Sequence, residues 1–295
     1  MKLVTFSCRG RVSIGKVVED QIIDLPSSDG ALPRTMLELL QAGPAALERA
    51  RDIQIERAVT FPFDDVRLEA PVPNPSKFLA IGMNYRKHAQ EAIDLGVKVP
   101  DSQLWFNKQV SCINGPYDPV HMPVASDQLD YEAELGVVIG KRCRHVSVGQ
   151  APSVVAGYLA VNDVSVRDWQ MRSPTMTLGK SFNTHGPIGP WIVTADEVPD
   201  PHALQIRMKV NGELRQEGNT SDLIYNIWQQ IAYLTTVMTL EPGDIIATGT
   251  PSGVGVAMKP PSYRRIGDVM RVEIDGIGHI ENVVVAEPYR AGYEQ

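Results

Sequence analysis

The most informative stretch of the sequence is DYEAELGVVI, residues 130–139, in which two acidic residues lead into an apolar, β-branched run typical of a buried strand. Residues two apart on a strand share a face, so Glu132 and Glu134 are expected to project side by side. Two adjacent carboxylates repel each other unless a proton or a cation lies between them. The pattern therefore predicts a strand that enters the core and carries a pair of acids at its edge.

A divalent cation is one way to relieve this repulsion, because Mg²⁺ and similar hard cations prefer oxygen ligands. A third ligand is then expected, and Asp163 ends a second apolar stretch, YLAVND, at residues 158–163. An acid within an apolar strand costs free energy unless it has a partner. The alternative is that the acids are solvated or form ion pairs with Lys141, Arg167 or Lys180. Spacing alone leaves both interpretations open.

A second candidate site lies in the segment GMNYRKHAQE, residues 82–91. His88 and Glu91 are three apart on a predicted helical turn, so they share a face and can form a hydrogen bond. A carboxylate that holds an imidazole in one tautomer raises its basicity, which suits a general base. The alternative is an exposed turn with ordinary charged neighbours. The glycine-rich segment 248–255 lacks the features of a phosphate-binding loop, and we expect it to let substrate approach the backbone closely.

Length and composition limit the class of protein. The chain has 295 residues, 43% of them hydrophobic and 21% charged, and a net charge of −7, which fits a folded globular protein. The negative charge argues against nucleic acids and anionic membranes as partners. Three widely separated cysteines fit a reducing compartment, and no apolar run reaches the ~20 residues of a spanning helix. We therefore expect a cytoplasmic protein.

The chain divides at its proline-rich segment APVPNPS, residues 70–76. Residues 1–72 are predicted to form a small α+β domain with short strands over 2–25 and two short helices. Residues 73–295 are predicted to form a larger, strand-rich domain. Asn-Gly at 211–212 indicates a hairpin turn, and a helix with Ser221 as its cap is expected to follow. The pattern favours an α+β fold in which an antiparallel sheet closes on itself.

Taken in order, these segments resemble the fumarylacetoacetate hydrolase superfamily, in its acylpyruvase and diketo-acid hydrolase branch. The matching segments are AIGMNY at 80–85 with His88 and Glu91, LDYEAEL at 129–135, residues 157–168, GKSF at 179–182, GPIGPW at 186–191, and LEPGDIIATGTP at 240–251. The resemblance covers about residues 74–285. Each motif alone is loose, but six in one order are specific.

The resemblance implies a mixed β-roll catalytic domain, usually in a homodimer, after a small N-terminal domain. It implies that Glu132, Glu134 and Asp163 bind Mg²⁺ or Mn²⁺, with Ca²⁺ as a substitute in a crystal. Catalytic groups are implied at His88, Glu91 and Lys180. Substrate contacts are implied at Arg167, Gln170, Lys108 and Thr250. The substrates of the family are compact oxo acids: acylpyruvates, other diketo acids and oxaloacetate.

Three functional hypotheses follow from this resemblance. In the first, the enzyme hydrolyses a carbon–carbon bond of a small diketo acid. His88, oriented by Glu91, deprotonates a water that attacks the distal carbonyl, and the metal and Lys180 stabilise the enolate that leaves as pyruvate or a related oxo acid. In the second, the same metal site decarboxylates oxaloacetate, or hydrates or isomerises a related oxo acid. The third is a non-catalytic metal-binding protein.

Overall fold

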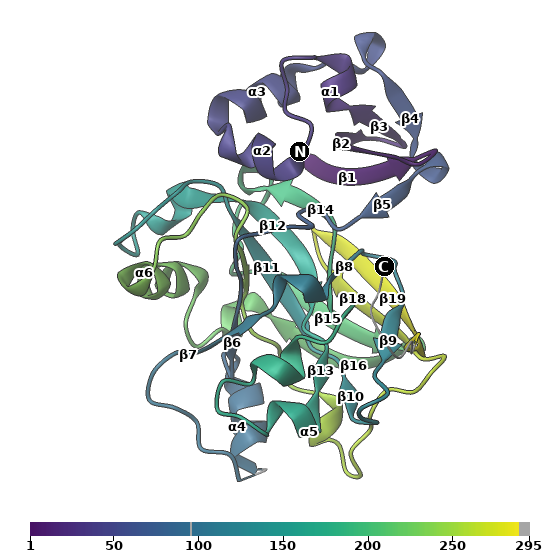
Figure 1. The fold of residues 1–295 in the computed structure, drawn as a ribbon. Coiled ribbons are helices and arrows are strands. Elements are labelled where there is room, and N and C mark those ends of the chain that lie inside the picture. Colours follow the sequence, from purple (N-terminus) through teal and green to yellow (C-terminus); the bar gives the residue numbers. More distant parts are fainter. Residues whose placement is uncertain (95, 289–295) are drawn as a thin grey trace.

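A computed structural model describes residues 1–94 and 96–288 (Figure 1). The N-terminal part combines short strands with three helices. Its elements are β1 (Lys2–Cys8), β2 (Arg11–Val18), β3 (Gln21–Asp24), α1 (Leu25–Ser28), α2 (Met36–Gln41), α3 (Pro44–Asp52), β4 (Thr60–Pro62) and β5 (Arg67–Glu69). The strands and the two short helices expected in this region are therefore confirmed.

The rest of the chain is rich in strands. The strands are β6 (Phe78–Gly82), β7 (Leu104–Lys108), β8 (Ile113–Asn114), β9 (Val120–Met122), β10 (Leu129–Asp130), β11 (Ala133–Ile139), β12 (Val155–Asn162), β13 (Ser165–Val166), β14 (Gly186–Thr194), β15 (Gln205–Val210), β16 (Glu213–Asn219), β17 (Ile245–Ala247), β18 (Val269–Ile274) and β19 (Gly278–Ala286). The α-helices are α4 (Arg86–Asp94), α5 (Arg167–Gln170) and α6 (Ile227–Val237).

One large sheet runs through both parts of the molecule, in the order β4-β3-β2-β1-β14-β12-β11-β17-β6-β7. Along this path only β17 and β6 pair in parallel. A second sheet, β16-β15-β18-β19-β9, packs against β11, β12 and β14. The architecture is α+β and strand-rich with antiparallel sheets, as the sequence predicted.

The N-terminal strands extend this sheet because β1 pairs with β14, with Lys2 opposite Val193. An apolar cluster also joins the two parts, since Leu3 and Ile14 belong to the same buried group as Leu159. The division of the chain into residues 1–72 and 73–295 stays a prediction. Figure 1 shows the N-terminal part at one end of the molecule and α4 and α5 at the other.

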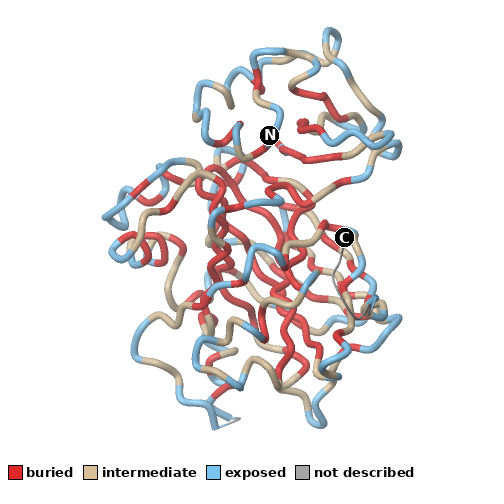
Figure 2. Tube along the Cα trace, in the orientation of Figure 1, coloured by how far each residue is buried: buried red, intermediate tan, exposed pale blue. Residues whose placement is uncertain are grey.

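Burial is concentrated in the central strands of the large sheet (Figure 2). Every residue of β11 is buried, and so is every residue of β12 after the first. A charged side chain at the end of either strand therefore enters a layer from which water is largely excluded. Such a charge needs a partner of opposite sign or hydrogen bonds to be tolerated there.

The predicted cap of helix α6 is wrong. Ser221 lies in a separate 3₁₀ turn (Thr220–Asp222), and α6 begins at Ile227 after the cap residue Asn226. The side chain of Asn226 accepts a hydrogen bond from the main chain of Gln229, whose side chain accepts one in return, so the two form a capping box. None of the helices in the described residues is long and apolar enough to cross a membrane.

Candidate active site

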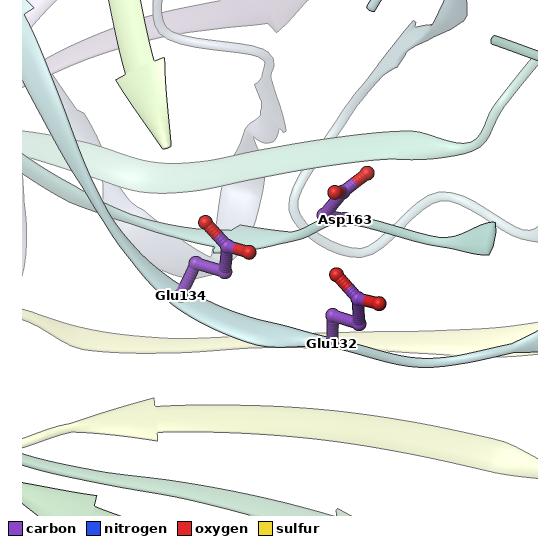
Figure 3. A group of neighbouring side chains, drawn as sticks. All are labelled: Glu132, Glu134 and Asp163. Atoms are coloured by element: carbon purple, nitrogen blue, oxygen red, sulfur yellow. The ribbon is translucent and has the colours of Figure 1, made fainter. Parts of the chain in front are cut away.

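Three carboxylates meet where two neighbouring strands end (Figure 3). Glu132 joins β10 to β11, Glu134 lies on β11, and Asp163 follows β12. The main-chain N–H of Asp163 donates to the carbonyl oxygen of Glu132 at 2.9 Å, which holds the two segments together. An oxygen atom from each carboxylate lies within 4.8 Å of the other two, and all three residues are buried. The structure thus brings together the three acids that the sequence selected.

Buried cations surround two of these carboxylates. Arg167 donates to Glu132 at 2.6 Å, and Lys180 reaches both Glu132 at 2.8 Å and Asp163 at 2.7 Å. Lys108 donates to the other oxygen of Asp163 at 2.7 Å. The ion pairs with Arg167 and Lys180 that were weighed as an alternative are therefore present. Burial opposes ionisation of Glu132, but Lys180 and Arg167 outweigh it and hold the pKa of that carboxyl below its ordinary value.

Glu134 is the surplus negative charge of the cluster. It accepts one hydrogen bond, from the main-chain N–H of Gly249 at 2.7 Å, and among the described residues no Lys or Arg forms an ion pair with it. Burial, followed by the charges of Asp163 and Glu132, raises the pKa of Glu134 well above its ordinary value. Three converging carboxylates, one of them without a cationic partner, fit a hard divalent cation with oxygen ligands.

The predicted dyad forms on helix α4. His88 Nδ1 lies 3.1 Å from Glu91 Oε2, and both side chains are largely shielded from solvent. The other oxygen of Glu91 accepts a hydrogen bond from the main-chain N–H of Gly253 at 2.9 Å. This second contact fixes the carboxylate, which in turn fixes the orientation of the imidazole.

The glycine-rich segment 248–255 supports both groups of residues. Gly249 has φ +107° and Gly253 has φ +104°, a region that side chains with a Cβ rarely adopt. A Cβ at residue 253 would lie 2.1 Å from the carbonyl oxygen of Arg215, so only glycine fits there. The N–H groups of Gly249 and Gly253 bind Glu134 and Glu91, and close approach of substrate to this loop stays a prediction.

One cavity of about 200 Å³ joins these features. Eight of the ten predicted site residues line it: His88, Glu91, Glu132, Glu134, Arg167, Gln170, Lys180 and Thr250. Gln170 accepts a hydrogen bond from Arg167 at 2.9 Å, and the hydroxyl of Thr250 donates to the carbonyl oxygen of Ala133 at 3.0 Å. Asp163 and Lys108 are not among the lining residues. Lys108 is buried and binds the oxygen of Asp163 that does not contact Lys180.

Sequence reasoning missed two residues that position the site. Asp130 is buried and accepts hydrogen bonds from Arg167 at 2.8 Å and from the main chain of Gly255 at 2.9 Å. It lies two residues before Glu132, so the alternation that selected the acidic pair could have found it. Gln216 donates to the hydroxyl of Thr250 at 2.8 Å, and no local pattern marks this contact because the two residues are 34 positions apart.

Comparisons with known proteins find relatives that cover most of the chain. A family model described as fumarylacetoacetate (FAA) hydrolase, C-terminal, matches residues 77–285. An oxaloacetate tautomerase of Xenopus laevis, described as mitochondrial, is 43% identical over 291 residues, which cover 97% of this chain and 90% of the relative. A mitochondrial oxaloacetate tautomerase of Homo sapiens is 43% identical over 266 residues, which cover 90% of this chain and 84% of the relative.

Solved structures are similar over nearly the whole chain. A fumarylacetoacetate hydrolase from Exiguobacterium antarcticum has a TM-score of 0.86 and 37% identity, and the match covers 97% of this chain and 100% of that one. Maleylpyruvate hydrolase from Sphingobium sp. SYK-6, solved with a manganese(II) ion and pyruvate, has a TM-score of 0.81 and 36% identity, with coverage of 97% and 99%. The chain therefore belongs to the fumarylacetoacetate hydrolase family, a family of enzymes.

Proposed function

We propose that this protein is a divalent-metal-dependent enzyme that moves a proton at the carbon beside the 2-oxo group of a compact oxo acid. The first candidate reaction is keto–enol tautomerisation of oxaloacetate. It matches only loosely the second hypothesis from the sequence, in which oxaloacetate is decarboxylated or a related oxo acid is hydrated or isomerised. The observation that carries the proposal is that the His88–Glu91 dyad lines the same cavity as Glu132, Glu134 and Lys180. The oxaloacetate tautomerases at 43% identity support this choice of reaction.

Glu132, Glu134 and Asp163 would hold the cation, Mg²⁺ or Mn²⁺. When bound, such a cation supplies Lewis-acid polarisation of a carbonyl oxygen. The manganese ion in the maleylpyruvate hydrolase structure supports this assignment.

His88 takes and returns the proton. Its Nδ1 faces Glu91, which leaves Nε2 as the nitrogen available to substrate. In the forward direction the imidazole removes a proton from carbon 3 of the keto form, and a proton is delivered to the oxygen at carbon 2 to give the enol. The reverse direction uses the same groups, and no other atom is gained or lost. Glu91 keeps the basic nitrogen in place throughout.

Arg167 and Lys180 supply the positive charge of the cavity. Asp130 and Glu132 hold the guanidinium of Arg167 in one orientation, and Gln170 contacts it from the cavity side. A fixed guanidinium is suited to the carboxylate of an oxo acid, because its donors match a carboxylate in geometry. Lys180 stabilises the negative charge that develops on the substrate when the proton leaves.

Hydrolysis of a carbon–carbon bond in a diketo acid is the second candidate. The similarity to maleylpyruvate hydrolase at 36% identity favours it. Here His88 removes a proton from water, the hydroxide adds to the distal carbonyl, and the bond to carbon 3 breaks. The proton returns to carbon 3 of the leaving oxo acid, so one water is consumed.

The test is a rate measurement on chelator-treated protein reconstituted with Mg²⁺ or Mn²⁺. Enolic oxaloacetate is followed by its absorbance, against a blank that contains the metal without protein. The expected result is metal-dependent loss of the enol that falls about 100-fold or more in His88→Gln. Acetylpyruvate in a parallel assay reports the hydrolase through release of pyruvate and acetate. A rate equal to the blank with oxaloacetate would overturn the tautomerase, and release of pyruvate from acetylpyruvate would then favour the second candidate.

Other expectations from the sequence stay predictions. These are assembly into a homodimer, a cytoplasmic location and the absence of nucleic-acid and membrane partners. A small oxo acid remains the proposed ligand. The two tautomerases compared above are described as mitochondrial, a description that belongs to those proteins.

A further inference from the structure

Strand β17 covers one edge of β11 only as far as Gly136, which pairs with Ala247. The chain then enters the glycine-rich loop, where Thr248 donates from its N–H and its hydroxyl to the carbonyl oxygen of Leu135, at 3.1 and 2.9 Å. Residues 132–134, which carry the acidic pair, lie beyond this point. Groups other than a β17 ladder therefore hold this edge of the segment in place.

Ala133, between Glu132 and Glu134, is held by a closed ring of hydrogen bonds. Its N–H donates to the side-chain oxygen of Gln216 at 3.0 Å, and its carbonyl oxygen accepts from the hydroxyl of Thr250 at 3.0 Å. The amide nitrogen of Gln216 closes the ring by donating to the hydroxyl of Thr250 at 2.8 Å. We call the ring formed by Ala133, Gln216 and Thr250 the Gln216 clamp. It fixes both main-chain polar groups of the residue that separates the two acids.

The partners of Gln216 determine which end of its amide is the oxygen. The N–H of Ala133 can only donate, and the carbonyl oxygen of Pro251, 2.7 Å from the amide nitrogen, can only accept. The two hydrogens of the amide are both used, one on Pro251 and one on Thr250. Gln216 is buried, so a side chain without these groups would leave the N–H of Ala133 unpaired, which is unfavourable.

Gln216 reaches the site from the second sheet, at a break in strand pairing. On β16 it lies opposite Met208, whereas Lys209, the next residue of β15, lies opposite Leu214, so the pairing skips Arg215. An extra residue in one strand redirects the side chains around it, and such bulges are frequent next to active sites. The local irregularity of β16 thus accompanies a glutamine aimed at the acidic pair of another sheet.

We propose that the Gln216 clamp raises the affinity of the site for Mg²⁺ relative to Ca²⁺ by fixing the separation of Glu132 and Glu134. This inference rests on the proposed function, because it requires the carboxylates to bind a divalent cation. Mg²⁺ demands near-ideal octahedral geometry with short bonds, whereas Ca²⁺ accepts longer bonds in flexible arrangements. Carboxylates held at one separation suit the first ion, and freedom of the strand end suits the second. Gln216 is a positioning residue, since it acts through Ala133 and Thr250.

The test is displacement of Mn²⁺ from the protein by Mg²⁺ or by Ca²⁺. Free Mn²⁺ is measured by its electron paramagnetic resonance signal, so no substrate is needed. Gln216→Met nearly keeps the length of the side chain and removes its hydrogen bonds. We expect its affinity for Mg²⁺ to fall about tenfold and its affinity for Ca²⁺ less than about threefold, which shifts the ratio toward Ca²⁺.

Gln230→Met is the matched control. Gln230 is fully buried on α6, donates to the carbonyl oxygen of Tyr225 at 2.9 Å and does not line the cavity. Both substitutions remove a buried hydrogen bond and should lower the unfolding temperature. Only Gln216→Met should change the ratio of the two affinities.

Gln216→Glu is a second variant, which keeps the shape of the side chain. Its carboxylate can accept from the N–H of Ala133 but cannot donate to Thr250 and Pro251. The added charge attracts Mg²⁺ and Ca²⁺ alike, so the ratio should again shift toward Ca²⁺. Circular dichroism checks the fold of each variant, and Gln216→Glu alone decides if Gln216→Met does not fold.

The outcomes separate this inference from the proposed function. An unchanged ratio of affinities in a folded Gln216 variant would overturn the inference and leave the metal site standing. A shift of equal size in Gln230→Met would also overturn it, because the effect would not come from the clamp. Failure of the wild-type protein to bind Mn²⁺ would overturn the proposed function itself.

Discussion

Glu134→Gln is expected to stabilise the protein when divalent metal is removed. Glu134 is buried beside Glu132 and Asp163 and lacks the cationic partners that those two acids have. At pH 7 it must either ionise against two neighbouring charges or stay protonated. Holding a proton above the ordinary carboxyl pKa costs about 1.4 kcal/mol per pH unit, so the penalty can reach about 3.5 kcal/mol at pH 7. Glutamine keeps the shape and removes this cost.

The assay is thermal unfolding of wild type and variant, first with a chelator and then with Mn²⁺. With chelator, the variant should unfold about 5 °C higher than wild type. With Mn²⁺ at 1,000 times the dissociation constant, wild type should gain about 4.1 kcal/mol and the variant almost none. The order of stability of the two proteins therefore reverses when metal is added.

Glu132→Gln is the matched control for this reasoning. It also removes one carboxylate of the triad, but Glu132 is the partner of the buried cations Arg167 and Lys180. Removing one member of a buried ion pair costs about 3–5 kcal/mol. This variant should therefore be less stable than wild type with chelator. A lower unfolding temperature for metal-free Glu134→Gln, or an unchanged response of that variant to Mn²⁺, would refute the argument.

Three further predictions concern individual residues. Lys180→Met should bind Mn²⁺ more tightly in calorimetry, because the ammonium no longer competes with the ion for Glu132 and Asp163. Turnover should fall at least tenfold. An unchanged affinity for Mn²⁺ would contradict the proposed competition. Burial lowers the pKa of His185 to about 3, so the unfolded chain binds a proton that the native protein does not between about pH 6.5 and pH 3. The free energy of unfolding should therefore decrease as the pH is lowered through that window, by up to about 1.4 kcal/mol per unit. Urea unfolding of His185→Gln should show a smaller decrease, and the same pH dependence as wild type would contradict this. Gly249→Ala places a Cβ 2.8 Å from the Cβ of Asn84 at φ +107°. A lower unfolding temperature and weaker Mn²⁺ binding are therefore expected. Wild-type values for both would contradict the role of the Gly249 N–H in holding Glu134.

The period of side chains along the sequence predicted the features that are set by residues close together in the chain. Alternation along residues 130–139 predicted strand β11 and the side-by-side placement of Glu132 and Glu134, and helical spacing predicted the contact between His88 and Glu91. Each of these follows from local geometry alone, because side chains repeat every two residues on a strand and every three to four on a helix.

Contacts between distant segments could not be predicted in this way. Gly249 binds Glu134 across 115 positions, and Gly253 binds Glu91 across 162. The sequence marks these glycines as a loop but does not show which carboxylates the loop meets. The cap of α6 was predicted wrongly for a related reason, because Ser221 and Asn226 both suit a helix N-terminus. The loop before α6 decides between them, since the main chain of Tyr225 forms hydrogen bonds with the side chain of Asn84.

We propose that the three buried carboxylates form a divalent-cation site, and anomalous scattering from a crystal grown with Mn²⁺ shows whether the ion binds there. We expect one strong peak bonded to an oxygen atom from each of Glu132, Glu134 and Asp163, with the ammonium of Lys180 moved out from between Glu132 and Asp163. The same peak should disappear from crystals of Glu134→Gln. A crystal with Mn²⁺ bound elsewhere, and with Lys180 still joining the two carboxylates, would contradict the claim.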